Sequence, residues 1–182
     1  MDRSYLTMGV DPSPRRVGWA VLDVAKPRSP TYVRSGVIEA RGAARPARLA
    51  SLYAEFVELL RQQPLDSVAF ESGGAYRGRS GRRNPDPVLY QAEARGLMMG
   101  AAIASHAAIA LYAPAAVKQV ATGQGQTCKS AVALVMGLRF GRRDLGPDEA
   151  DALAVAWCHS QVQATREFIR VHALEGGFYG QD

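Results

Sequence analysis

The sequence has few cysteines and no long hydrophobic run. Cys128 and Cys158 are its only cysteines among 182 residues, and they offer neither a disulfide framework nor the paired spacing of a zinc site. Both lie in apolar helical patterns, so we expect buried free thiols. The longest uncharged stretch, residues 96–112, falls short of a membrane span, and the N-terminus shows no apolar signal-peptide core. We therefore expect a cytoplasmic protein with no membrane association.

Lysine is also scarce, although the chain is basic. The net charge is +5 and the isoelectric point is about 9.5, yet Lys26, Lys118 and Lys129 are the only lysines among 22 basic residues. The remaining basic residues are arginines. A basic protein that also contains a local group of acids is typical of a polyanionic partner combined with a metal centre. Mild basicity alone is common, so an ordinary soluble protein remains an alternative at this point.

The order of the predicted elements indicates a mixed α/β sheet with helices on its faces. Three strands with short connections come first and predict an antiparallel meander. We find no repeat, linker or second domain, so residues 1–182 are expected to form one domain, with a loose tail at 176–182. Apolar patterns predict strands at residues 5–11, 17–21, 32–38, 67–70 and 109–112, and helices at 46–62, 87–105, 115–121, 128–138 and from about 147.

Four acidic residues occupy unusual positions. Asp11 and Glu71 each close an apolar strand, where a carboxylate is costly to desolvate unless a cation meets it. Asp148 and Asp151 lie three residues apart and share one face of the last predicted helix. Pro147 and the helix dipole explain Asp148 without any function, but they do not explain Asp151, one turn further in. The four acids together predict a site for divalent metal ions of the kind that hydrolyses phosphodiesters.

Several short motifs resemble the RuvC family of Holliday-junction resolvases, in order over residues 7–159. Met8-Gly9-Val10-Asp11-Pro12 is similar to the family's first strand, and Phe70-Glu71 to the segment with its glutamate. The other matching segments are Ala92-Glu93-Ala94-Arg95-Gly96, Tyr112-Ala113-Pro114-Ala115-Ala116-Val117-Lys118, Gly123-Gln124-Gly125 with Lys129-Ser130, and Asp148-Glu149-Ala150-Asp151-Ala152-Leu153-Ala154.

The resemblance implies a ribonuclease-H-like fold with a mixed five-stranded sheet and helices on both faces. It implies a homodimer that cuts four-way junction DNA by paired nicks, in recombination and repair, with RuvA- and RuvB-like partners. It assigns Asp11, Glu71, Asp148 and Asp151 as catalytic metal ligands for two ions, with Asp11 expected to bridge them. Hard oxygen ligands without histidine favour Mg²⁺ or Mn²⁺ over zinc.

Further residues are expected to contact DNA. Because lysine is scarce, Lys118 and Lys129 are expected to hold backbone phosphates rather than to serve only as surface charges. The segment after Glu71 is longer than the family pattern, and it contains Tyr76, a candidate for stacking on a base. Ser13-Pro14 also departs from the family's usual Gly-Ser. The arginines expected to bind DNA in the longer segment are Arg77, Arg79, Arg82 and Arg83.

Three other functions remain open from the sequence. Residues 123–130 nearly form a Walker A loop, but Cys128 replaces the second glycine, and residues 114–121 separate the loop from the preceding strand. A sugar-kinase-like or actin-like protein would need a second domain of similar size. A junction-binding module without catalysis would gain affinity by losing its four acids, and they are present.

The predicted helix at 87–105 is our candidate for a dimer contact. A twofold dimer would supply two active sites related by the symmetry of the junction. Small residues permit a close approach of two helices, and Leu97 and Met98 are expected to fill the seam. The alternative is a helix that packs only on its own sheet. The small residues are Gly96, Gly100, Ala101 and Ala104.

Overall fold

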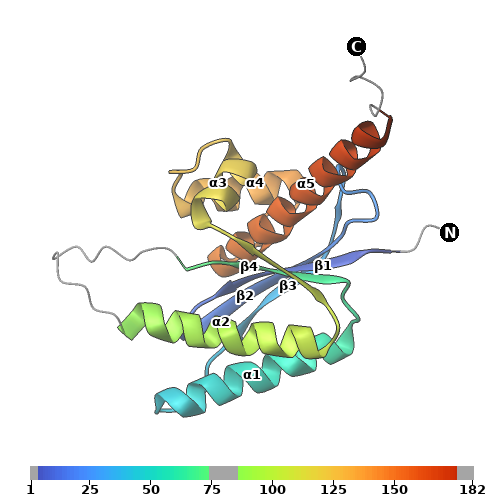
Figure 1. Cartoon of the computed structure of the whole chain (residues 1–182). Helices are drawn as coiled ribbons and strands as arrows, with labels where there is room; N and C mark the ends of the chain where they lie inside the picture. The colour runs from blue at the N-terminus through green and yellow to red at the C-terminus, as the bar shows by residue number, and fades with distance from the viewer. Residues whose placement is uncertain (1–3, 74–85, 176–182) are drawn as a thin grey trace.

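The computed structural model describes residues 4–73 and 86–175, and it contains one five-stranded sheet (Figure 1). The strand order is β3-β2-β1-β4-β5. β1, β2 and β3 form an antiparallel meander, whereas β4 and β5 run parallel to β1. The strands are β1 (Leu6–Pro12), β2 (Arg16–Asp23), β3 (Thr31–Glu39), β4 (Ser67–Glu71) and β5 (Ala108–Tyr112).

Helices cover both faces of the sheet. The first face carries α1 (Arg45–Gln62) and α2 (Asp86–Ala104), and its core contains Phe56, Phe70 and Met98. The second face carries α3 (Pro114–Thr122), α4 (Lys129–Phe140) and α5 (Pro147–Glu175). In Figure 1, α5 starts beside the end of the sheet where β4 finishes and runs diagonally past the opposite end. The expected mixed sheet with helices on both faces is confirmed.

The helix ends follow local signals that the sequence carries. Proline lies in the first turn of α1 and of α3, where its missing N–H costs no hydrogen bond. Gly123 and Gly141 end α3 and α4 in the left-handed conformation, with φ of 80° and 65°. The predicted elements all occur, with ends within about two residues of the expected positions, as is usual for helix ends.

Some expectations about individual side chains were wrong. Cys158 is buried as predicted, but Cys128 is exposed because it caps the N-terminus of α4 instead of lying inside a helix. Met98 and Ala101 do not fill a seam on the outer surface of α2. They are 1% and 5% exposed and pack in the core against the sheet, whereas Leu97 is 41% exposed.

Two expectations concern residues outside the described part of the chain. The tail at 176–182 is one of them. The other is most of the arginine-rich segment, with Tyr76, Arg77, Arg79, Arg82 and Arg83. Within residues 4–73 and 86–175, no helix combines the length and apolar character needed to cross a membrane.

Candidate active site

Asp11 and Glu71 lie at the same end of two neighbouring parallel strands. Val10 of β1 pairs with Phe70 of β4, and each acid is the next residue. Side chains alternate between the faces of a strand. Since Val10 and Phe70 belong to the core under α1 and α2, Asp11 and Glu71 point to the opposite face, toward α5. The pairing of β1 with β4 therefore brings together two residues that are 60 positions apart.

Two glycines let α5 approach the strands closely enough to add its own acids. A Cβ atom on Gly9 would lie 2.2 Å from the backbone oxygen of Ala152, and one on Gly18 would lie 2.0 Å from that of Asp148. Neither position leaves room for a side chain. Gly18 is also the register partner of Asp11. The first turns of α5 thus rest directly on strand backbone beside Asp11, with Asp148 and Asp151 in those turns.

The electrostatics show that these acids interact. Burial raises the pKa of Asp11 to about 6, with added repulsion from Asp151 and Asp148 and an opposing effect of Lys129. Burial likewise raises the pKa of Glu71 to about 7, and Asp11 and Asp151 add to the shift. In both cases burial is the main cause of the raised pKa, and neighbouring carboxylates add to it. Such perturbed groups gathered at one place are typical of functional sites.

Cations meet two of the carboxylates directly. Lys129, at the start of α4, bonds to Asp151 with 2.5 Å between Nζ and Oδ2. Burial lowers the pKa of Lys129, but the hydrogen bond and charge of Asp151 outweigh this and raise it. Arg16 Nε lies 3.2 Å from Asp148 Oδ2. Lys118 of α3 acts at longer range, where its charge lowers the pKa of Glu71.

The four acids gather at one end of the sheet without touching as a set. Among the described residues, no three side chains of His, Cys, Asp or Glu converge closely enough to hold a metal ion as they stand. The donor chemistry nevertheless fits a hard divalent cation, because all four are carboxylates and two have raised pKa values. Lys129 and Arg16 hold Asp151 and Asp148 in other contacts, so ligation would require those contacts to rearrange.

Several residues at this end were not singled out from the sequence. Gly9 and Gly18 could have been found, because glycine inside a strand often marks the close approach of another backbone. Arg16 offered no such signal. On the other face of the sheet, α2 contacts the end of β1 and lies near the segment that follows β4. Gln91 donates a hydrogen bond to the carbonyl of Pro12 at 3.0 Å, and the Arg95 guanidinium lies 3.1 Å from where a Cβ on Gly73 would be.

The near-Walker segment has the wrong surroundings for a phosphate-binding P-loop. Such a loop connects a strand directly to a helix. Here α3 lies between β5 and the loop, and Gly123 serves as the cap of α3. Lys129 is bonded to Asp151. The P-loop alternative is therefore not supported.

Comparison with known sequences assigns a family. The family described as "Crossover junction endodeoxyribonuclease RuvC" matches residues 7–159. Proteins of that name include one from Cereibacter sphaeroides, 33% identical over 156 residues, which are 84% of this chain and 88% of that protein. Another, from Nitratidesulfovibrio vulgaris, is 32% identical over 168 residues, which are 91% of this chain and 97% of that protein.

Comparison with solved structures shows the same fold. RuvC of T. thermophilus, solved in complex with a Holliday junction substrate, superposes with a TM-score of 0.77 at 24% identity, over 89% of this chain and 96% of that one. The yeast mitochondrial Holliday junction resolvase Ydc2 gives a TM-score of 0.68 at 14% identity, over 96% of this chain and 85% of that one. At these identities the likeness concerns the arrangement of the strands and helices.

Proposed function

The chain belongs to the crossover junction endodeoxyribonuclease RuvC family, and from that premise we propose that it resolves four-way DNA junctions by metal-dependent phosphodiester hydrolysis. The observation that carries the proposal is the convergence of Asp11, Glu71, Asp148 and Asp151 at one end of the sheet, where two of them have strongly raised pKa values. A basic protein with its acids gathered at one place suits a polyanionic substrate that is cut there.

The four carboxylates would hold two Mg²⁺ or Mn²⁺ ions. Asp11 is our candidate for the shared ligand, because its pKa responds to both Asp151 and Asp148. When bound, such ions would activate the attacking water and stabilise the charge on the leaving oxygen. Before any ion binds, Lys129 neutralises Asp151 and Arg16 neutralises Asp148. These cations keep closely placed acids compatible with folding.

Lys129 and Lys118 would hold the DNA backbone beside the acids. The Lys129 side chain is 67% exposed while that of Asp151 is 13% exposed, so the ammonium lies between the acid cluster and solvent. Lys118 is near enough to influence Glu71. A phosphate held there is stabilised most when charge builds up on it during the reaction. The lysines would therefore contribute more to the rate than to affinity.

That distinction can be measured with Lys118→Ala and Lys129→Ala. We expect each to lower the single-turnover cleavage rate by at least tenfold more than it lowers junction affinity, as is typical when a group stabilises developing charge. Both constants should be measured on one junction. Arg143→Ala, at an exposed position between α4 and α5, is a control for the loss of a cation. If loss of affinity accounts for the whole loss of rate, the lysines only anchor the DNA.

We further propose a homodimer that contacts its partner through the outer strip of α2. The strip contains Leu89, Leu97 and Ile103, which are 54%, 41% and 59% exposed. Among the described residues, no atom other than the adjacent backbone of α2 lies within 4 Å of a Cβ position on Gly96 or Gly100, so a second helix could approach closely there. Two copies related by a twofold axis would place two active sites on one junction.

Replacement of Gly100 by Arg tests the dimer. The charged side chain would enter the proposed seam, and the position is open in the single chain, so the variant should fold. We expect light scattering to report a dimer for the unmodified protein and a monomer for Gly100→Arg, with cleavage reduced to single nicks. A monomeric unmodified protein, with and without DNA, would contradict the proposal.

The primary test of function compares a labelled four-way junction with linear duplex of the same sequence. We expect paired nicks in the junction with Mg²⁺ or Mn²⁺, no nicks with chelator, and little cutting of the duplex. A role in recombination and repair with RuvA- and RuvB-like proteins would follow from this activity. Junction binding without cleavage under any metal would favour the alternative, a binding module without catalysis.

A further inference from the structure

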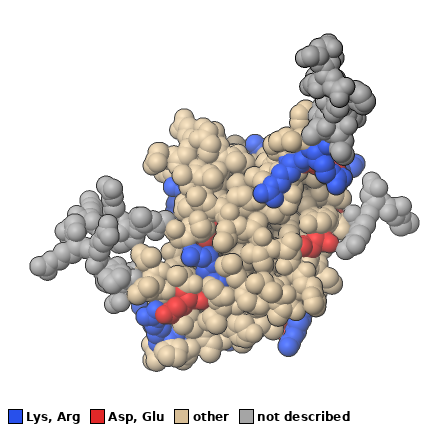
Figure 2. Space-filling view, in the orientation of Figure 1, with Lys and Arg blue, Asp and Glu red and all other residues tan. Residues whose placement is uncertain are grey.

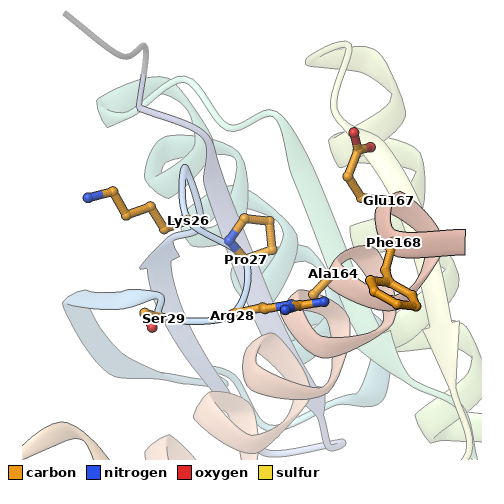
Figure 3. Close-up of a pocket in the computed structure, with 7 residues that line it drawn as sticks. All are labelled: Lys26, Pro27, Arg28, Ser29, Ala164, Glu167 and Phe168. Carbon is orange, nitrogen blue, oxygen red and sulfur yellow. The ribbon is translucent and has the colours of Figure 1, made fainter. Parts of the chain in front are cut away.

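A pocket of about 410 Å³ lies where the loop between β2 and β3 meets the C-terminal half of α5 (Figure 3). At 1.5 Å per residue, Ala164 is about 20 Å along α5 from Asp151. The pocket is therefore at the opposite end of the sheet from the acid cluster, and the proposed catalysis does not use it. It is lined by Lys26, Pro27, Arg28 and Ser29 of the loop and by Ala164, Glu167 and Phe168 of α5.

The loop is fixed on the helix, so the pocket is formed in advance. Ser160 Oγ donates a hydrogen bond to the carbonyl oxygen of Pro27 at 2.5 Å, and Gln161 Nε2 donates to the same oxygen at 3.1 Å. Ser160 is completely buried, which protects its bond from competition by water. A site that is already shaped loses less conformational entropy when a ligand binds.

The lining combines an apolar floor with a positively charged rim. Pro27 and Ala164 form the floor, and Phe168 forms a wall that is 48% exposed. Arg28 lies 5.3 Å from the centre of the Phe168 ring, and the Lys26 side chain extends from the edge of the pocket outward, away from α5 (Figure 3). Among the described residues of the lining the acid is Glu167, and its carboxylate lies 3.5 Å from Arg170.

The surroundings of the pocket carry further positive charge. Figure 2 shows basic side chains gathered over the C-terminal half of α5, and the exposed residues there include Arg166 and Arg170. The apolar floor can accept a large side chain, and the rim can pair with carboxylates beside it. Complementary charge of this kind favours an acidic ligand and excludes a basic one.

We propose that this pocket docks an acidic segment of a partner protein that carries one large apolar side chain. The apolar side chain packs on Pro27, Ala164 and Phe168, and its neighbouring carboxylates pair with Lys26 and Arg28. DNA would satisfy the cations but leave the apolar floor exposed. A second copy of this chain, docked through the same surface, would bring cation against cation. The occupant thus differs from the DNA that the acid cluster is proposed to cut.

The probe for this site is a fluorescent 12-residue peptide with a central Leu-Phe pair flanked by aspartates and glutamates. Fluorescence anisotropy with the whole protein should show saturable binding that weakens as salt rises. Phe168→Ala should weaken it about tenfold, as expected for loss of a half-buried aromatic contact. Ile169→Ala removes an exposed apolar side chain that does not line the pocket, and it should leave binding unchanged.

Two further experiments measure separately what the positive charges and the apolar side chain of the peptide contribute to binding. The double variant Lys26→Glu with Arg28→Glu should weaken binding and reduce its salt dependence, whereas Arg166→Glu should have a smaller effect. A peptide with Ser-Ser in place of Leu-Phe should bind at least tenfold more weakly. Equal binding of the two peptides, or displacement of the probe by duplex DNA, would overturn the proposal in favour of a general anion surface.

An NMR titration of the unmodified protein gives a readout that does not depend on variants. The Leu-Phe peptide should shift the amide signals of Ser29, Ala164 and Glu167 and leave those of Asp11 and Glu71 in place. Shifts centred elsewhere, or no binding at millimolar peptide, would overturn the proposal. Junction cleavage by Phe168→Ala should equal that of the unmodified protein, which also verifies that the variant folds.

Discussion

The two ends of the β1–β4 strand pair contain polar side chains in the same geometry but in opposite energetic states. At one end, Thr7 and Ser67 are register partners, both are buried, and their hydroxyl oxygens are 2.5 Å apart in a shared hydrogen bond. At the other end, Asp11 and Glu71 occupy the corresponding positions on the same face, and burial and neighbouring acids raise the pKa of both. One end is satisfied within the chain, and the other is left with excess negative charge.

The side chains at one end of the strand pair serve stability and those at the other end serve function, although each strand spans the two ends in only five residues. A neutral hydroxyl pair that donates and accepts internally contributes to folding and offers nothing to a ligand. Two partly buried carboxylates that repel one another work against folding, and they attract cations for the same reason. The comparison predicts that changes at the two ends will have opposite consequences.

The largest expected effect comes from Asp11→Asn and Glu71→Gln. Each removes a proposed ligand charge without changing size, so junction cleavage should fall about a thousandfold or more, since several kcal/mol of charge stabilisation are lost. Junction binding should persist, and the unfolding free energy at pH 8 in chelator should rise because repulsion is relieved. Asp151→Asn should also abolish cleavage.

Asp144→Asn serves as the control for these variants. Asp144 is an exposed acid bonded to Arg142 and lies outside the cluster, so its neutralisation should leave cleavage unchanged. Cleavage at the unmodified rate by Asp11→Asn or Glu71→Gln would remove that residue from the site. A loss of both cleavage and stability would contradict the assignment of opposite roles to the two ends.

A smaller effect, on stability alone, is expected from Thr7→Val. The substitution keeps the shape but leaves the Ser67 hydroxyl buried without its partner, which costs about 1–3 kcal/mol. Urea unfolding should show this loss, while cleavage per folded molecule stays constant. The double variant Thr7→Val with Ser67→Ala should recover part of the stability, since neither polar group is then stranded. A cleavage defect without a stability defect would show that the two ends are coupled.

The smallest expected effect is a pH dependence of stability in chelator. The folded pKa values of Asp11 and Glu71, about 6 and about 7, lie above those of the unfolded chain, near 4. Between about pH 4 and 7 the folded state therefore binds more protons, and these groups make stability fall as pH rises. His159, whose pKa burial lowers to about 4, acts in the opposite direction.

The difference between the unmodified protein and Asp11→Asn isolates the carboxylate contribution, because His159 is common to both. We expect the unfolding free energy of the variant, relative to that of the unmodified protein, to increase by on the order of 1 kcal/mol between pH 5 and 8, after allowance for solvent screening. Urea unfolding at several pH values measures it. Parallel curves for the two proteins would mean that Asp11 titrates normally. Thr7→Val should follow the unmodified protein, displaced by a constant amount.

The fold and the grouping of the acids could be predicted because they depend on patterns that a sequence displays. Strand alternation, helical spacing and the prolines and glycines at helix ends are local signals. The ordered motifs around Asp11, Glu71 and Asp148 indicate the family even though no single motif does. The confirmed mixed sheet follows from these signals alone.

Contacts between distant residues could not be predicted in the same way. The pairing of Lys129 with Asp151 and of Arg16 with Asp148 depends on where α4 and the β1–β2 turn lie in space. Cys128 was expected to be buried because its neighbours are apolar, but its position one residue before α4 exposes it. Met98 showed the converse error, since which side of α2 faces the sheet depends on packing.

The contact of α5 with Gly9 and Gly18 has a consequence for how this scaffold tolerates change. Where side chains separate a helix from a sheet, repacking can tilt or slide the helix by small steps. Here the backbone of α5 packs directly on strand backbone, so the helix has no room to tilt or slide toward the sheet. Substitutions elsewhere in the core should leave Asp148 and Asp151 in place, whereas a side chain at Gly9 or Gly18 should push α5 away from the strands and displace both acids.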